Sequence, residues 1–119
     1  MTGSTRYLKE QNPNIKAFTV EADSGTKIPG TGAFVDGDYV TPFIAKAYED
    51  NLFDGSNRVT IEQAMARTRQ LADQGFFVGF QTGGVLEGAI RTIKEHGLKG
   101  DIVMISGDSG WKNVDKLMG

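Results

Sequence analysis

Cysteine is absent from the 119 residues, which excludes disulfide bonds, a thiolate nucleophile and any cysteine metal site. Histidine is nearly absent as well. The single histidine, His96, stands in the last turn of an expected helix, where the helix dipole favours it. One histidine cannot build a histidine-based metal centre or a Ser-His-Asp triad. We therefore predict no metal site, and the sequence assigns no catalytic residue.

An excess of positive charge is also missing. The chain has 13 Lys and Arg against 15 Asp and Glu, a net charge of -2 and a pI near 5.3. This balance disfavours nucleic acid and anionic membranes as partners. No apolar run approaches a membrane span or a signal-peptide core, so we expect a cytoplasmic protein with no membrane association. With 39% hydrophobic residues, the chain should form one α/β domain over residues 1–119.

Helices and strands are expected to alternate. Helices are predicted over 2–11 and 42–50, and from a capping box of Thr60 and Gln63 to Gly75. A further helix, ending at Gly97, should bury an apolar stripe made of Val85, Leu86, Ala89, Ile90 and Ile93. Strands are predicted at 15–22, 58–60 and 101–106, the last a continuous apolar run typical of a strand covered on both faces. Residues 23–41 should form a long irregular connection. The alternation predicts a layered α/β fold with a mainly parallel sheet.

Two glycine-containing loops should lie beyond carboxyl ends of strands, where α/β sheets bind ligands. The first, QTGG at 81–84, would open a helix and could hold an anion or a polar ring atom on its free N–H groups. Alternatively, Gln81 and Thr82 only cap that helix. The second, SGDSG at 106–110, could equally be a tight turn formed by Asp108 and Ser109. A nucleotide-binding domain is less favoured, because no Walker-type lysine follows the glycines.

Four stretches, in this order, resemble the C-terminal part of the pyridoxal-phosphate-dependent enzymes of the cysteine synthase and cystathionine β-synthase family. They are residues 2–22, 27–35, 58–90 and 101–113. The most specific pieces are RYLKE shortly before NPNIKAFTVE, the helix and loop ARTRQLADQGFFVG, and the final apolar run with its DSG turn. The resemblance spans nearly the whole chain. It implies part of the large domain of a fold type II enzyme, arranged as a partial three-layer sandwich.

The resemblance also implies a reaction and a cofactor. The reaction is β-replacement on O-acetylserine or O-phosphoserine with a sulfur donor, as in cysteine biosynthesis, and the cofactor is pyridoxal phosphate. In that family the first hydroxyl residue of a Gly-Ile-Ser-Ser-Gly loop contacts the pyridine nitrogen. The matching position is Gln81, followed by Thr82 and Gly83, so these three are the expected cofactor-binding residues. Either Gln81 or Thr82 could meet the nitrogen.

The family's substrate entrance is matched by Gly30, Thr31 and Gly32, which are the expected substrate-binding residues, and is shortened before Phe34. The family's Schiff-base lysine, Thr-Ser-Gly-Asn loop and Gly-Thr-Gly-Gly-Thr phosphate cradle all precede the matched segment. Met1 thus stands where a complete enzyme has an internal residue. We expect an incomplete domain, either a truncated product or an excised piece, that neither catalyses nor stably binds pyridoxal phosphate alone.

The remaining lysines, among them Lys9, Lys27, Lys94 and Lys112, are expected to be solvated charges. An incomplete parallel sheet leaves backbone groups unpaired, so we expect a homo-oligomer or a partner chain that carries the N-terminal half. The amino-acid substrate would bind only in the complete enzyme. The alternative function is a non-enzymatic α/β binding or scaffold module.

Overall fold

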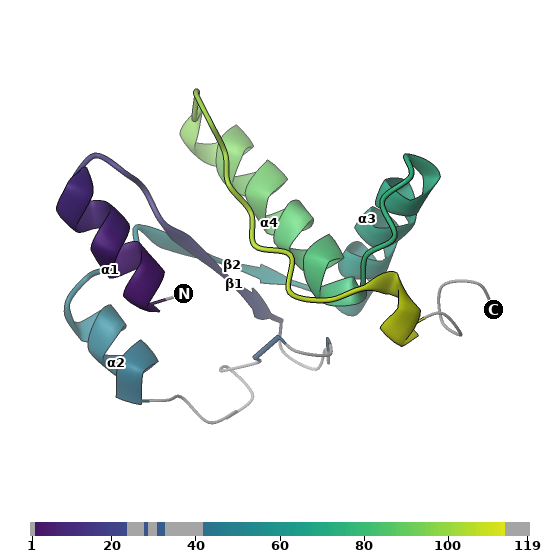
Figure 1. Cartoon of the computed structure of the whole chain (residues 1–119), viewed down its shortest axis with the longest axis horizontal. Helices are drawn as coiled ribbons and strands as arrows, with labels where there is room; N and C mark the ends of the chain where they lie inside the picture. Colours follow the sequence, from purple (N-terminus) through teal and green to yellow (C-terminus); the bar gives the residue numbers. More distant parts are fainter. Residues whose placement is uncertain (1, 24–27, 29–30, 33–41, 114–119) are drawn as a thin grey trace.

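The computed structural model describes residues 2–23, 28, 31–32 and 42–113, so most of the connection expected at 23–41 lies outside the described residues. The described helices and strands, shown in Figure 1, are α1 (Thr2–Gln11), β1 (Phe18–Ala22), α2 (Pro42–Glu49), β2 (Gly55–Val59), α3 (Ile61–Asp73) and α4 (Phe80–His96), followed by a 3-10 helix at Gly110–Asn113. The four predicted helices and the first two predicted strands are confirmed, with shifted ends.

The two strands form a parallel pair whose register runs from Phe18 opposite Gly55 to Ala22 opposite Val59. Because side chains alternate along a strand, one face of the pair meets α4 and the other meets α2. On the α4 face, Asn57 Nδ2 donates a buried hydrogen bond of 2.6 Å to Thr92 Oγ1. The core on this face contains five buried apolar residues: Ala22, Ile28, Val59, Ala64 and Phe80.

The opposite face of the strand pair is polar and contacts α2. Tyr48 of α2 donates a hydrogen bond of 2.8 Å to Glu21 Oε1, and its hydroxyl lies 3.3 Å from Thr19 Oγ1. Burial raises the pKa of Tyr48 above its ordinary value of 10.0, so the hydroxyl keeps the proton that it donates. Helices therefore lie on both faces of a parallel pair, which confirms the predicted layered α/β class.

Apart from Phe80 at its start, the face of α4 that the fold buries consists of small and polar residues. Its buried members are Phe80, Thr82, Gly83, Gly84, Gly88 and Thr92. The predicted apolar stripe, from Val85 to Ile93, is only half-buried, so that prediction was wrong. At Gly84 and Gly88 the helix backbone lies so close to the sheet that a Cβ would sit 3.4 Å and 2.5 Å from methyl groups of Val59 and Val20. At Gly88 only a residue without a Cβ allows this approach, whereas a Cβ at Gly84 would make an ordinary van der Waals contact.

Helix ends follow the predicted signals in part. The capping box of Thr60 and Gln63 is present at α3, and α4 ends at Gly97 in the left-handed conformation with a φ of 60°. Helix α4 begins at Phe80, however, so residues 81–84 form its first turn and not a loop. The N–H groups of Gln81 and Thr82 lie at a helix start, as the sequence predicted, but inside the helix, and the Gly83 N–H donates to the Gly79 carbonyl oxygen.

Residues 101–106 do not form the predicted strand. Ile102, Val103 and Ile105 are exposed, at 44%, 84% and 72%. Within the described residues β1 and β2 make up the sheet, and it does not extend to this segment. A strand needs a neighbouring backbone to satisfy its N–H and C=O groups. Without one, the apolar run has no regular secondary structure.

The close packing of Gly88 predicts the effect of adding a single methyl group. Gly88→Ala should lower the free energy of unfolding by about 1–3 kcal/mol, because the new Cβ would overlap a methyl group of Val20. Gly3→Ala in α1 is the matched control, since a Cβ at Gly3 would meet nothing within 4 Å and alanine favours the helix. Urea unfolding measures both. A Gly88→Ala protein as stable as the Gly3→Ala protein would contradict this packing.

A carboxylate before β2 holds α1 and the start of β1 together. Lys9 Nζ and the Ala17 N–H donate to Asp54 Oδ2 at 2.8 Å and 2.7 Å. Burial alone would raise the pKa of Asp54, but the hydrogen bonds from Lys9 and Ala17 and the nearby positive charge of Lys16 outweigh it and lower the pKa below 3.8. Ionised Asp54 therefore stabilises this end of the fold.

This contact predicts a pH-dependent stability. A carboxyl with a lowered folded-state pKa stabilises the fold above its unfolded pKa and loses that contribution as pH falls through the folded value. Asp54→Asn should therefore be less stable than the natural sequence near neutral pH, and the two should converge in acid below the ordinary value of 3.8. Thermal unfolding across pH measures this. Asp101→Asn, at an exposed aspartate, should show no such convergence.

Candidate functional site

The amino end of α4 is occupied by the carboxylate of Asp108. The N–H groups of Gln81 and Thr82 donate to Asp108 Oδ2 and Oδ1 at 3.0 Å and 3.1 Å. The N-cap residue, Gly79, has no side chain to satisfy these donors. A negative charge at a helix start is also favoured by the helix dipole. These N–H groups, which by sequence could hold an anion or a polar ring atom, therefore donate to the protein's own carboxylate.

The hydroxyl of Thr82 belongs to the same network. Thr82 is 4% exposed, and its Oγ1 donates to Asp108 Oδ1 at 2.6 Å. Its Oγ1 also lies 2.8 Å from the Oγ of Ser106. A hydroxyl has one proton, so Thr82 donates to the carboxylate and accepts from Ser106. The hydroxyl proton of Thr82 is therefore donated to Asp108.

Gln81 and Gly83 differ from Thr82 in their surroundings. Gln81 is partly exposed, and its carboxamide lies beside Gly107, where a Cβ would be 2.8 Å from Gln81 Oε1. Gly83 is buried against α3, because a Cβ there would overlap Thr68 and the carbonyl oxygen of Ala64. Gly83 thus lets α4 approach α3, while Gln81 stands at the partly open side of the helix start.

The predicted substrate-binding segment returns to the end of β1. The Ala22 N–H donates to the Gly32 carbonyl oxygen at 2.8 Å, and the Thr31 N–H donates to that of Ile28 at 3.0 Å. Thr31 and Gly32 are partly exposed, whereas Ile28 is 2% exposed. Gly30 lies outside the described residues. The described part of this segment is therefore anchored at the carboxyl end of a strand.

The predicted cofactor and substrate segments lie at the same edge of the sheet. The first turns of α4 reach the carboxyl end of β2, where Gly84 packs beside Val59. A Cβ at Gly84 would also lie 4.0 Å from Ile28, just before the segment of Thr31 and Gly32. Figure 1 shows the start of α4 beside the ends of the two strand arrows. This is the edge at which parallel α/β sheets bind ligands.

Asp108 and Ser106 were not predicted as partners of the helix start. The missing N-cap side chain at Gly79 was the signal that another residue must satisfy these donors. The SGDSG stretch is thus neither a free loop nor a turn alone, because its aspartate caps a helix that starts 28 residues earlier along the chain. Ser109 forms an isolated antiparallel bridge with Val78, which joins the same two segments.

The described lysines are either exposed or ion-paired. Lys94 is exposed as predicted, while Lys9 is ion-paired with Asp54 and only 20% exposed, which corrects its prediction as a solvated charge. Lys27 and the side chain of Lys112 lie outside the described residues. Across the described ranges, no three His, Asp or Glu side chains gather to hold a metal. None of the helices described is long and apolar enough to cross a membrane.

Comparison with known proteins identifies the fold. No protein-family model matches the chain. It is 29% identical over 94 residues to cysteine synthase B of Pseudomonas aeruginosa, and 28% identical over 120 residues to cysteine synthase 3 of Caenorhabditis elegans. It superposes on an O-acetylserine-dependent cystathionine β-synthase of Helicobacter pylori with a TM-score of 0.79 over 96% of its length, at 25% identity. These matches support the chain as a fragment of the cysteine synthase and cystathionine β-synthase family.

The chain spans only about a third of the length of these relatives. It spans 30% and 33% of the two cysteine synthases, although 78% and 92% of its own residues are covered. A hydrogen sulfide-producing enzyme of Fusobacterium nucleatum is 33% identical, with a TM-score of 0.74, and the match covers 93% of this chain and 39% of that enzyme. The described fold thus corresponds to about a third of a fold type II enzyme.

The contacts of Asp108 predict that its side chain stabilises the helix start. Asp108→Ala should cost about 1–3 kcal/mol of unfolding free energy, because two N–H groups and a buried hydroxyl lose their acceptor. Asp108→Asn should cost less, since one oxygen remains. Urea unfolding and faster hydrogen exchange at Gln81 and Thr82 measure the effect. Asp101→Ala is the matched control, and equal stability of the two alanine variants would contradict this assignment.

Proposed function

We propose that this chain forms part of a pyridoxal-phosphate-dependent enzyme of the cysteine synthase type, which catalyses β-replacement on O-acetylserine or O-phosphoserine with a sulfur donor. The observation that carries the proposal is the match to the O-acetylserine-dependent enzyme of Helicobacter pylori over 96% of this chain. The placement of both candidate segments at one edge of the sheet supports it. When bound, pyridoxal phosphate supplies the electron sink for such a reaction.

We propose Gln81 as the residue that donates a hydrogen bond to the pyridine nitrogen. Thr82 is a poor candidate, because its only hydroxyl proton is donated to Asp108. A carboxamide offers two N–H donors, so Gln81 can serve the nitrogen and keep another partner. Its backbone N–H is fixed by Asp108, which holds the base of the side chain in place. The residues present therefore fit a neutral pyridine ring at this position.

The same geometry argues that the cofactor's phosphate binds elsewhere. Helix starts often bind phosphate, but the Gln81 and Thr82 N–H groups at the start of α4 already donate to a carboxylate. A phosphate there would meet a like charge. This fits the resemblance, in which a separate phosphate cradle and the Schiff-base lysine come from segments that these 119 residues do not match.

For substrate we propose Gly30, Thr31 and Gly32. The backbone of the described part, Thr31 and Gly32, is tied to β1 and Ile28, while both residues stay partly exposed. Such a segment can present backbone groups to an amino-acid carboxylate at the sheet edge. A non-enzymatic binding module remains the second candidate, favoured by the exposed apolar segment 101–106.

The proposal predicts that these 119 residues alone do not attach the cofactor, whereas a completed enzyme does. After incubation with pyridoxal phosphate, borohydride reduction and dialysis, mass spectrometry of the chain should show no stable lysine adduct. A chimaera in which this chain replaces the matching part of the Pseudomonas aeruginosa cysteine synthase B should carry the adduct. It should also form cysteine from O-acetylserine and sulfide.

Gln81 variants of the chimaera are the controls. Gln81→Leu should lower kcat about 10-fold or more, because a hydrogen bond to the ring is lost, while Gln81→Ser should retain most activity. A folded chimaera that carries the cofactor but forms no cysteine would contradict the proposed reaction. An adduct on the isolated chain would contradict its dependence on other segments.

A further inference from the structure

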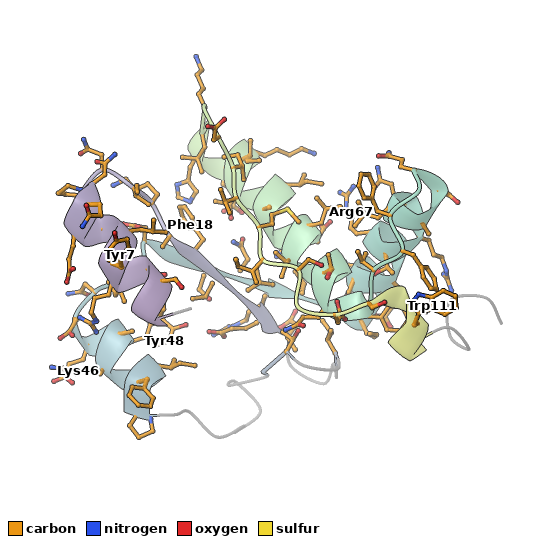
Figure 2. All side chains as sticks on the ribbon, viewed as in Figure 1. Tyr7, Phe18, Lys46, Tyr48, Arg67 and Trp111 are labelled. Atoms are coloured by element: carbon orange, nitrogen blue, oxygen red, sulfur yellow. The ribbon has the colours of Figure 1, made fainter. Side chains whose placement is uncertain are left out.

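The loop that leads into the 3-10 helix is fastened to the chain just before α4. Ser109 forms an antiparallel bridge with Val78, and the Gly110 N–H donates to the Phe77 carbonyl oxygen at 3.2 Å. Figure 2 shows Trp111 projecting from the 3-10 helix, and its ring packs edge-on against Phe77 with the ring centroids 5.0 Å apart. These contacts fix the loop immediately after the aspartate that caps α4.

The same loop is held on the other side of that aspartate by two hydroxyls. Ser106 Oγ lies 2.8 Å from Thr82 Oγ1, which donates to Asp108 Oδ1 at 2.6 Å. A carboxylate only accepts, so the protons of this chain of hydrogen bonds all point one way, from Ser106 to Thr82 and from Thr82 to Asp108. The loop is therefore anchored to the start of α4 both before and after Asp108.

The contacts of Asp108 fix the rotation of its carboxylate. Oδ2 accepts from the Gln81 N–H, while Oδ1 accepts from both the N–H and the hydroxyl of Thr82. The hydroxyl is the only one of these donors that belongs to a side chain, and it holds Oδ1 so that Oδ2 faces Gln81. The backbone from which the Gln81 carboxamide extends is thus held by a carboxylate that is itself held.

We propose that Asp108 is a positioning residue for Gln81, and that Thr82 supports it by fixing the carboxylate. This role rests on the proposed function, since Gln81 is the residue assigned there to the pyridine nitrogen. Thr82 then acts through Asp108 and not by contact with the cofactor. Groups that orient a ligand-binding side chain affect a reaction strongly, because small displacements of a reacting group slow it.

Helix α4 offers a matched pair of buried threonines for the test. Thr82 and Thr92 are 4% and 5% exposed, and each hydroxyl takes part in a buried or part-buried hydrogen bond. They stand ten positions apart in one helix, about 15 Å along its axis. Valine at either position removes the hydroxyl and keeps the branched shape. Both variants lose a hydrogen bond, but only Thr82→Val loses one to Asp108.

The first measurement needs no cofactor. In the chain itself, Thr82→Val should speed hydrogen exchange of the Gln81 amide about 3- to 10-fold, the effect of about one hydrogen bond on local opening. Thr92→Val should leave exchange at Gln81 near that of the natural chain. Unchanged exchange at Gln81 in Thr82→Val would overturn the supporting role of Thr82.

The second measurement uses the chimaera with cysteine synthase B. Thr82→Val should lower its kcat about 10-fold and shift the visible absorption band of the bound cofactor, because the donor to the ring is displaced. Thr82→Ser should restore both, since serine keeps the hydroxyl. Thr92→Val should leave the kcat and the absorption band near their natural values, because its hydroxyl is remote from the helix start.

Asp108→Glu gives a second variant should Thr82→Val fail to fold. It keeps the charge but extends the carboxylate by one methylene, so the oxygens no longer match the two N–H groups. It should speed exchange at Gln81 and lower the kcat as Thr82→Val does. Asp101→Glu, at an exposed aspartate, is the matched control and should change neither.

The outcomes separate this role from the proposed function. A natural chimaera that folds but forms no cysteine contradicts the proposed function, while exchange at Gln81 still reports the contacts of Asp108. An active chimaera in which Thr82→Val equals Thr92→Val in kcat and absorption overturns the positioning role alone. Loss of activity in Thr82→Val without faster exchange at Gln81 overturns it as well, because Thr82 would then contact the cofactor directly.

Discussion

The contact of the glycine face of α4 with the sheet and with α3 is the constraint on which the described fold depends. Gly84 and Gly88 lie against the sheet, and Gly83 lies against α3. Three glycines in one helix cost about 3 kcal/mol of helix propensity relative to alanine. The closeness they permit offsets this cost, because the backbone of α4 can then lie directly on Val20 and Val59. A Cβ at Gly83 would overlap α3 and one at Gly88 would overlap Val20, so side chains at these two positions would lift the helix from its neighbours.

The same contact positions the candidate site. With Gly84 on the carboxyl end of β2, the first turn of α4 reaches the edge at which parallel α/β sheets generally bind ligands, and Asp108 meets it there. The carboxylate satisfies the helix start, and Gln81, the residue that we propose for the ring nitrogen, carries a neutral carboxamide. A site built in this way suits a ring nitrogen better than a phosphate, since its charge is already balanced. The polar groups at this edge of the sheet are therefore positioned by the packing of α4 on the strands.

The sequence predicted where helices and strands lie better than it predicted which of their side chains are buried. The capping box at Thr60, the helix end at Gly97 and the two strands are local features, and the structure confirms them. The buried face of α4 was predicted wrongly because hydrophobic periodicity gives weight to large side chains, and glycine carries none. The contact of Asp108 with Thr82 joins segments 26 residues apart, so no local pattern reveals it.

The error at residues 101–106 has a different physical origin. A continuous apolar run is typical of a strand that is covered on both faces. A strand forms, however, only where another backbone lies beside it and satisfies its N–H and C=O groups. In the described residues none does, and the run stays exposed. Its carboxyl end continues through Ser106 into Asp108, the residue that fixes the backbone of Gln81. Only two residues separate Ile105 from Asp108, whose carboxylate caps α4. A backbone that pairs with this run would therefore also influence the position of Asp108 at the helix start.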